Sequence, residues 1–316
     1  MKNLLRCPNC FESLQIISNK KALNCNNCGK KYTKTFNFLD AILEDDIGYI
    51  EKQSFETWGK DLHIASDKNK VGHINILNKK FVEFPNILSD YVLEVGCGTG
   101  ADAEYISSLP SVENIIAIDI GENCKDIALQ NVDNRKLKVI RANCLNLPFK
   151  DEQFSFVYSY GVIHHTSNPL KALIEIKRVL KPKGKVYLYV YSSHSKNPLK
   201  KLGVIIELLL MKFLSLLNKN LQISLIYLIS IVCWGLFSFP SLVLKKLGKK
   251  KLAEKLPMHW GSTPLIIIPD LKDRLLAPVN HRYSIKKIRN LLSKSELIEI
   301  DIVEDYSGIY LVAGKK

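Results

Sequence analysis

Three glycines alternate with small residues directly after an apolar run that contains a single acid. The run is Val92-Leu-Glu-Val95, and the glycines that follow it are Gly96, Gly98 and Gly100. A short apolar run is typical of a buried strand. Glycines allow the next turn to take positive φ values and to lie close against a ligand. The stretch therefore predicts a strand that ends in a ligand-binding turn, with the carboxylate of Glu94 beside it.

A second apolar run ends in an acid about 20 residues after this turn, which is the spacing at which an acid can hydrogen-bond the hydroxyls of a ribose. Residues 115–119 read Ile-Ile-Ala-Ile-Asp, the pattern of a parallel strand that is buried on both faces. Asp119 lies at its carboxyl end. Gly96, Gly98 and Ala101 also satisfy a loose dinucleotide-binding pattern, so these two runs alone leave the kind of nucleotide ligand open.

Four cysteines near the start form two C-x-x-C pairs separated by 14 residues, Cys7 with Cys10 and Cys25 with Cys28. This spacing is typical of a four-thiolate zinc site, which supplies folding free energy to a segment too small to build its own core. Four thiolates leave no open coordination position, so we expect a structural zinc; a redox dithiol is the alternative. Such a ribbon could bind RNA or a protein partner, or it could be only a structural cap.

Composition bounds the class of protein. The chain has 316 residues, 47% of them hydrophobic and 24% charged, which suits one large α/β domain with a small additional one and excludes a disordered chain. The first residues, MKNLLRCPNC, lack the apolar region of a secretory signal. We therefore expect the eight cysteines to lie in a reducing cytoplasm.

Strand-like and helix-like segments alternate through the middle of the chain, which predicts an α/β fold with a doubly wound sheet. Strands are expected at 92–95, 115–119, 137–142, 154–159 and 185–191, and helices at 102–109, 123–132 and 170–180. Ligands of such sheets bind at the carboxyl ends of the strands. The glycine turn and Asp119 both lie there.

Four motifs in this order resemble those of the class I S-adenosylmethionine-dependent methyltransferases: VLEVGCGTG, IIAIDI, NLPFKDEQFSFVYSYGVIHH and IKRVLKPKGKVYLYVY. Within that class they are most similar to the branch with the ubiquinone and menaquinone C-methyltransferases. A nicotinamide-dependent dehydrogenase would share only the first two motifs. The resemblance implies a Rossmann-like sheet with an antiparallel last strand, formed by a helix at 284–293 and strands at 297–303 and 308–313. The opening CPNC and LNCNNCGKKY resemble the zinc-ribbon proteins related to the activator subunit of tRNA methyltransferases.

The methyltransferase resemblance also implies a set of residues that bind S-adenosylmethionine. Glu94 would lie near the amino group of the cofactor, Asp119 would accept from both ribose hydroxyls, and Ile120 would lie against the adenine. Asn143 stands where the family usually has an acid, so its amide oxygen and the backbone of Cys144 would recognise the adenine amine. The full predicted set is Glu94, Gly96, Cys97, Gly98, Gly100, Asp119, Ile120, Asn143, Cys144 and Ser159.

Methyl transfer from a sulfonium needs a general base only if the acceptor is a hydroxyl or an acidic carbon. Tyr160, His164 and His165 follow the fourth expected strand and are the catalytic candidates. The alternative for either histidine is a structural side chain that is hydrogen-bonded to nearby backbone. His281 and Tyr283 are possible substrate contacts, with surface packing as the alternative.

Residues 193–280 are expected to be an insert in the methyltransferase core. Leu221 to Leu244 carries no formal charge over 24 residues, and lysines flank it at Lys219, Lys245 and Lys246. The chain has a net charge of +14, of which +9 falls between Ser195 and Trp260, with eleven lysines against two glutamates. Three hypotheses remain: a helical lid over the substrate pocket, an interfacial element on anionic lipid through residues 202–251, and true membrane insertion.

The sequence predicts four parts: a zinc ribbon over 1–40, a linker with leading helices over 41–88, a core over 89–192 and 281–316, and the insert over 193–280. The leading hypothesis for function is methyl transfer from S-adenosylmethionine to a small-molecule or lipid-linked, hydrophobic acceptor. RNA methylation, using the ribbon and the basic surface, is the alternative, and a non-catalytic scaffold is a third. We expect a cytoplasmic protein that is peripheral on the inner face of the membrane.

Overall fold

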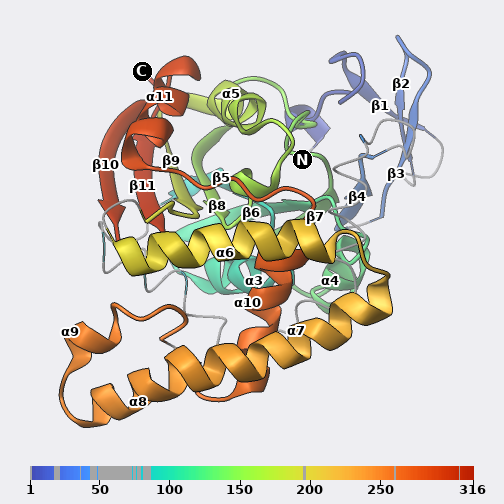
Figure 1. Ribbon diagram of the computed structural model, residues 1–316. Coiled ribbons are helices and arrows are strands. Elements are labelled where there is room, and N and C mark those ends of the chain that lie inside the picture. Colours follow the sequence, from blue (N-terminus) through green and yellow to red (C-terminus); the bar gives the residue numbers. More distant parts are fainter. Residues whose placement is uncertain are drawn as a thin grey trace.

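The computed structural model describes residues 2–17, 22–35, 37–42, 48, 73, 76, 80, 87–194, 197–259, 261–305 and 307–316. A mixed sheet of eight strands forms its centre, with helices on both faces (Figure 1). From one edge to the other the strands are β10 (Ile298–Glu304), β11 (Ile309–Gly314), β9 (Leu180–Val190), β8 (Phe154–Tyr160), β5 (Ile87–Val95), β6 (Val112–Asp119), β7 (Leu137–Arg141) and β4 (Phe38–Asp40).

Two hydrophobic clusters hold helices against the two faces of the sheet. One cluster joins Leu93 and Val95 of β5 to the helices α5 (Pro169–Val179) and α11 (Ile285–Lys294). The other joins Val92 of β5 to α3 (Ala101–Ser108) and α4 (Cys124–Gln130). Successive side chains of a strand point to opposite faces, so β5, which is apolar on both, is covered on both.

The sheet is parallel from β4 to β9 and antiparallel at its other edge. β5 pairs in parallel with β6 and β8, and β9 pairs in parallel with β8. β11 is antiparallel to both β9 and β10. The predicted fold class, a doubly wound Rossmann-like sheet with an antiparallel last strand, is confirmed.

The N-terminal segment forms a small sheet of its own and then joins the large one. β1 (Leu14–Ile17), β2 (Ala22–Cys25) and β3 (Lys31–Thr33) are antiparallel neighbours, as expected for a ribbon. β4 then pairs in parallel with β7, so the chain enters the large sheet before residue 41. The expected linker and helices over 41–88 lie mostly outside the described residues; Ile87 and Leu88, expected to end a helix, begin β5 instead.

All regular secondary structure in the described part of the insert is helical. It consists of α6 (Pro198–Leu214), α7 (Lys219–Cys233), η4 (Trp234–Ser238), α8 (Phe239–Lys246), α9 (Lys250–Ala253) and α10 (Pro264–Leu276). Asn197 and Asn218 begin α6 and α7 by accepting from the amides of Lys200 and Leu221 at 3.1 and 3.0 Å. η4 is a π-helical turn just before Pro240, which has no amide hydrogen to donate to the preceding turn.

α7, η4 and α8 form one continuous helix of 28 residues, Lys219–Lys246, which is long and apolar enough to cross a membrane by length and composition. One side of it packs against α10, which also packs against α6 (Figure 1). Leu214 of α6, Ile226 of α7 and Ile267 of α10 belong to a third hydrophobic cluster. The insert thus has a small core of its own.

Candidate functional site

The glycine turn is held tightly against the two neighbouring strands. Gly96, Gly98 and Gly100 have φ values of 82°, 53° and 78°, which favour glycine. The amides of Gly96 and Cys97 donate to the carbonyl of Ile118 at 2.8 and 2.9 Å, which ties the turn to the end of β6.

Two of these glycines have opposite surroundings. A Cβ atom on Gly96 would lie 2.0 Å from the side chain of Val162, whereas a Cβ atom on Gly98 would meet nothing within 4 Å. Packing therefore requires glycine at 96. The open space at Gly98 is where a ligand could approach the backbone.

Asp119 lies at the carboxyl end of β6 with its carboxylate in the turn. Its two oxygens accept from the amides of Gly98 and Gly121 at 2.8 and 2.9 Å. Asn123, at the start of α4, donates to the carbonyl of Gly98. These contacts orient the Asp119 carboxylate beside the open side of the glycine turn.

Glu94 is a buried carboxylate next to two others. Burial raises its pKa well above the usual range, and the negative charges of Asp102 and Asp119 raise it further. Its Oε2 atom has no hydrogen-bond partner among the described residues. A cationic group placed beside Glu94 would supply the missing partner.

The adenine side of the predicted site is built from the loops after β6 and β7. Asn143 accepts from the amide of Leu145 at 2.9 Å, so its amide oxygen caps its own loop in this structure. Cys144 and Ile120 are half-buried. Arg141 donates through Nε to the carbonyl of Ile120 at 3.2 Å and pairs with Asp40 of β4 at 3.2 Å, which joins this loop to the N-terminal segment.

Two predicted cofactor residues have side chains that are engaged in the core. The Ser159 hydroxyl is fully buried and donates to the carbonyl of Val95 at 3.0 Å, linking β8 to β5. The Cys97 thiol lies against Cys124, and this hydrogen bond together with burial raises its pKa well above the usual range. Any ligand contact of Ser159 or Cys97 would therefore come from the main chain.

The two candidate histidines differ in their partners. His165 points Nδ1 at the carbonyl of Val279, 2.9 Å away, and Nε2 at Asp273, 3.4 Å away. Neither nitrogen of His165 faces open space. His164 is fully buried, and neither of its ring nitrogens has a hydrogen-bond partner within the described part of the chain.

His164 is held as a neutral imidazole. Burial, followed by electrostatic interactions with the side chains of His165, Arg282, Arg274 and His281, lowers its pKa well below the usual range. Its ring lies 4.1 Å from that of Tyr191. Val162, two residues earlier, is the side chain that packs on Gly96.

Tyr160, the third candidate, belongs to a stack of aromatic rings at the carboxyl ends of β8 and β9 and the adjacent amino end of β11. Its ring lies 4.3 Å from Tyr189 and 3.9 Å from His73. Tyr189 in turn lies 4.7 Å from Tyr310. Burial raises the pKa of Tyr160 well above its usual value, so its hydroxyl stays protonated and is not a base near neutral pH.

Asp102, which the sequence prediction missed, is central to the site. It lies in the first turn of α3 and accepts from Tyr158 at 3.0 Å, and His73 lies 2.9 Å away. An acid directly after the glycine turn was the available signal, because helix N-termini favour carboxylates.

The insert meets the sheet through a buried polar network around the ring of Tyr191. The Tyr191 hydroxyl donates to Asp273 of α10, and Arg274 and Arg282 stack over the ring at 4.8 and 4.4 Å. Glu207 of α6 pairs with Arg282 and, at 3.4 Å, with Arg274. α6 and α10 are thus fixed to the end of β9.

His281 and Tyr283, the possible substrate contacts, border this network. The amide of His281 donates to the carbonyl of His164 at 2.8 Å, and that of Tyr283 to Tyr191 at 3.0 Å. The Tyr283 side chain is buried. Both residues support the histidine pair.

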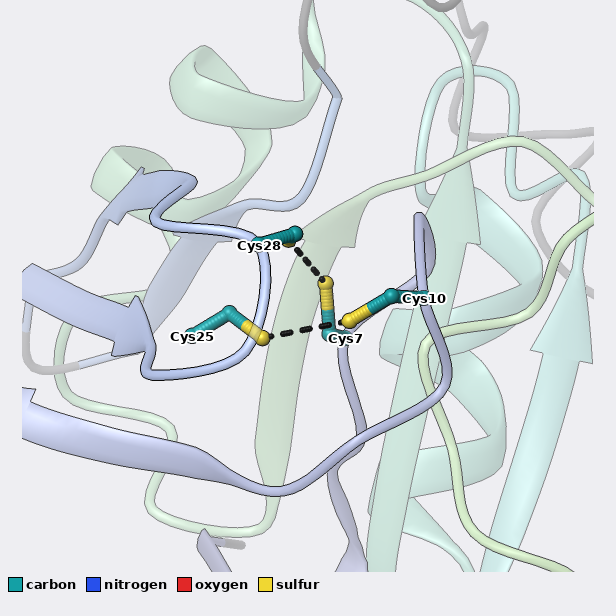
Figure 2. Close-up of side chains that lie close together, drawn as sticks. All are labelled: Cys7, Cys10, Cys25 and Cys28. Carbon is teal, nitrogen blue, oxygen red and sulfur yellow. Dashed lines mark hydrogen bonds between the residues drawn. The ribbon is translucent and has the colours of Figure 1, made fainter.

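The four cysteines of the N-terminal segment come together, with their sulfur atoms within 4.8 Å of one another (Figure 2). Cys7 lies 3.6 Å from Cys28 and Cys10 lies 3.3 Å from Cys25. Thiolates around a tetrahedral zinc, each about 2.3 Å from the ion, lie about 3.8 Å apart. The donor set and its spacing fit a zinc ion.

This cysteine segment is docked on the loop that follows β7. Arg6 donates from its amide to Pro148 at 3.0 Å, and Lys150 donates from its amide to Leu4 at 2.8 Å. Leu5, Cys7 and Cys25 lie in the same hydrophobic cluster as Phe149. The segment therefore supports the loop that carries Asn143.

Residues 93–188 match the family described as "Methyltransferase domain". The chain is 37% identical over 143 residues, 45% of its length and 58% of the relative's, to an uncharacterised protein of Methanocaldococcus jannaschii. It is 28% identical to a phthiotriol/phenolphthiotriol dimycocerosates methyltransferase of Mycobacterium tuberculosis, over 44% of this chain and 52% of that one. It is 36% identical to a probable tRNA methyltransferase 9B of Mus musculus, over 32% and 22%.

The chain spans less than two thirds of the length of each of these relatives. A solved S-adenosylmethionine-dependent methyltransferase from Aquifex aeolicus is 15% identical, with a TM-score of 0.45 over 80% of this chain and 94% of that one.

Proposed function

We propose that this chain, in which residues 93–188 form an S-adenosylmethionine-dependent methyltransferase domain, methylates a hydrophobic small-molecule or lipid-linked acceptor. The observation that carries the methyl-transfer proposal is the glycine turn with two carboxylates around it. Glu94 has an unpartnered oxygen, Asp119 lies at the end of the next strand, and Gly98 leaves open space between them.

The residues present fit S-adenosylmethionine, which supplies a methyl group on an activated, neutral leaving group. The Glu94 carboxylate would pair with the amino group of the methionine part. Asp119 would exchange its contact with the Gly98 amide for the ribose hydroxyls. Ile120, with the loop at Asn143 and Cys144, would hold the adenine.

Positioning supplies much of the acceleration in such a reaction, because the nucleophile has only to be held in line with the methyl group. For an acceptor that must lose a proton, we assign the base to His164. Its ring is neutral, and its nitrogens have no partner among the described residues. We assign His165 to positioning, because both of its nitrogens face protein oxygens.

Two features favour a hydrophobic acceptor. Aromatic rings, including those of Tyr160 and Tyr189, gather at the carboxyl ends of the strands beside the glycine turn. The insert that adjoins this end of the sheet carries many large, exposed apolar side chains. The similarity to a methyltransferase named for a lipid is in keeping with this class.

RNA is the second candidate acceptor. The similarity to a probable tRNA methyltransferase and the cysteine cluster favour it. Single-strand binding usually needs aromatic side chains among basic ones. Here Tyr227, Trp234 and Phe239 lie within the uncharged part of the insert, away from its lysines.

The test is transfer of a labelled methyl group from S-adenosylmethionine into separated lipids, small metabolites and RNA of the source cell. Label in an organic-soluble fraction, lost with Asp119→Ala, is the expected result. Label in RNA would instead identify RNA as the acceptor and overturn the proposal of a hydrophobic acceptor. An absence of cofactor binding by calorimetry would overturn the function itself and leave a non-catalytic scaffold.

We place the protein in the cytoplasm, peripheral on the membrane.

A further inference from the structure

The long helix of the insert exposes large apolar side chains on its outer side and buries three serines, beside apolar residues such as Ile226, on its inner side. In a helix on the surface of a water-soluble domain, apolar side chains face the core and polar ones face water. On α7, η4 and α8 the buried positions include Ser230, Ser238 and Ser241, while Leu228 and Leu236 are 57% and 62% exposed. Water does not favour that arrangement.

The buried serines of this helix are satisfied where they lie. Ser230 donates to the carbonyl of Tyr227 at 2.7 Å, Ser238 to Met258 at 2.7 Å and Ser241 to His259 at 3.0 Å. Small residues let a helix pack closely on its neighbours. The serines therefore mark the inner side of the helix.

The outer side of the helix forms a continuous apolar stripe. From Leu228 on, its members recur at spacings of three or four residues, with Ile231 and Val232 adjacent, and Leu221 precedes them by seven residues; together with Leu247, just after the helix, they extend over about seven turns. They are Leu221, Leu228, Ile231, Val232, Leu236, Phe239, Val243 and Leu247, all exposed.

α6 has a similar arrangement. Its acid, Glu207, points inward to Arg274 and Arg282, while large apolar side chains point outward. The outward residues are Leu202, Ile205, Ile206, Leu209 and Phe213, and Leu216 follows in the turn after α6. We call these residues, together with the stripe on α7, η4 and α8, the outer apolar face.

Positive charge surrounds the outer apolar face. Exposed lysines lie at Lys201, Lys212, Lys219, Lys246, Lys249, Lys250, Lys251 and Lys255. Between residues 198 and 255 the only acids are Glu207, which is paired inside, and Glu254. A second copy of the chain would bring identical lysines against these, so like charges oppose self-association.

We propose that the outer apolar face docks on an anionic lipid bilayer, with α6 and the α7–α8 helix lying in the plane of the membrane surface. Apolar side chains would enter the acyl boundary and the lysines would contact the headgroups. α10 holds the inner side of both helices, and its Asp273 and Arg274 are fixed to Tyr191 of the core. That attachment favours the in-plane arrangement over a spanning one.

Flotation of the full chain with vesicles tests this proposal independently of catalysis. We expect the chain to float with vesicles containing phosphatidylglycerol and poorly with phosphatidylcholine alone. Leu228→Gln with Leu236→Gln should weaken binding at least roughly tenfold. Leu129→Gln with Ile174→Gln, which changes two exposed apolar side chains of α4 and α5, should leave binding unchanged.

The charge contribution has its own matched pair of variants. Lys249→Gln with Lys250→Gln should weaken binding by about fivefold per lysine, whereas Lys171→Gln with Lys286→Gln on α5 and α11 should not. The proposal would be overturned if all these variants floated equally well, or if the parent chain did not float with the anionic vesicles. A dimer of the parent chain without lipid, which Leu228→Gln with Leu236→Gln converts to a monomer, would also overturn it, because the outer apolar face would then bind a second copy.

Orientation is tested with sealed vesicles and a membrane-impermeant maleimide. Lys219→Cys and Lys246→Cys, at the two ends of the α7–α8 helix, should both be labelled above the parent chain from outside. Protection of one end alone would indicate a span and contradict the in-plane arrangement.

Discussion

Three carboxylates, those of Glu94, Asp102 and Asp119, surround the glycine turn. Asp102 and Glu94 differ in their hydrogen-bond partners. Asp102 is held by Tyr158 and faces His73, whereas Glu94 keeps one oxygen without a partner among the described residues. The negative charges of Asp102 and Asp119 raise the pKa of the buried Glu94. A ligand that carries one cationic and one hydroxyl-rich part would relieve this repulsion and use both sides of the turn.

Asp119→Ala should weaken S-adenosylmethionine binding roughly 10- to 100-fold, because a charged acceptor for two hydroxyls is lost. Asp126→Ala, an exposed acid on α4, is the control and should leave affinity unchanged. Isothermal calorimetry measures both. Unaltered affinity of Asp119→Ala would contradict the assigned role.

Gly96→Ala and Gly98→Ala should differ in stability, although both place alanine at positive φ. Each should lose about 1–2 kcal/mol for that conformation. Gly96→Ala should lose a further 1–3 kcal/mol, roughly, because its Cβ atom would lie 2.0 Å from Val162.

Denaturant unfolding of the two single variants and of Gly96→Ala combined with Val162→Ala checks this. The second substitution should recover part of the additional loss. Equal stability of Gly96→Ala and Gly98→Ala would show that the contact is not limiting.

At the scale of elements, the cysteine segment and the insert both pack against the loops at the carboxyl ends of strands. The cysteine segment holds the loop after β7, and α6 and α10 hold the end of β9. Both act on loops at the carboxyl ends of strands, where ligands of such sheets bind.

A zinc ion held by the four cysteines would support both stability and cofactor binding, so its removal should affect both. Cys25→Ser, or a strong chelator, should destabilise the chain by more than about 4 kcal/mol, because the cysteines belong to the main hydrophobic cluster. Cofactor affinity should fall as the loop at Asn143 loses its support.

Zinc content by atomic absorption, denaturant unfolding and calorimetry measure these effects. Cys233→Ser, a cysteine on α7 outside the cluster, is the matched control. A metal-free parent chain of unchanged stability would contradict the zinc assignment.

The alternating elements were predictable because the central strands are mostly apolar and alternate with helix-like segments. Pro169–Val179 and Ile285–Lys294 also lie within a residue or two of their predicted bounds. β4 was not predictable, since three residues, Phe38-Leu-Asp40, carry no periodicity and gain their pairing from a strand about 100 positions away.

Within the site, the glycine turn and Asp119 could be located from spacing, but the partners of the histidines could not. The contacts of His165 with Val279 and Asp273 depend on how the insert returns to the sheet. The exposed side of the α7–α8 helix was equally hidden, because an almost wholly apolar sequence does not say which side is buried.

At the scale of the whole molecule, one sheet joins parts of the chain that are far apart in sequence, and histidines are buried where those parts meet. His164 lies between the end of β8 and the returning segment at 281–283. Its burial keeps it neutral. We therefore expect low pH to reduce the stability of the whole folded domain rather than to loosen a single loop.

Stability should fall as pH drops below about 6.5, at most by about 1.4 kcal/mol per pH unit from His164. The pKa of His164 is lowered in the folded state, so below its ordinary pKa the unfolded chain binds more protons than the folded one. Denaturant unfolding at several pH values, for the parent chain and His164→Gln, measures this. The variant should show a shallower dependence, and identical slopes would contradict the prediction.

The pairing of β4 with β7 also constrains the order in which the chain can be completed during synthesis. The outermost strand at one edge comes from residues 38–40, yet its partner is made only at 137–141. At the other side, β9 can pair with β11 only after β11 has been synthesised, more than 100 residues later. Neither side of the sheet can close until distant segments have left the ribosome, so we expect slow folding and a long interval with exposed strand edges.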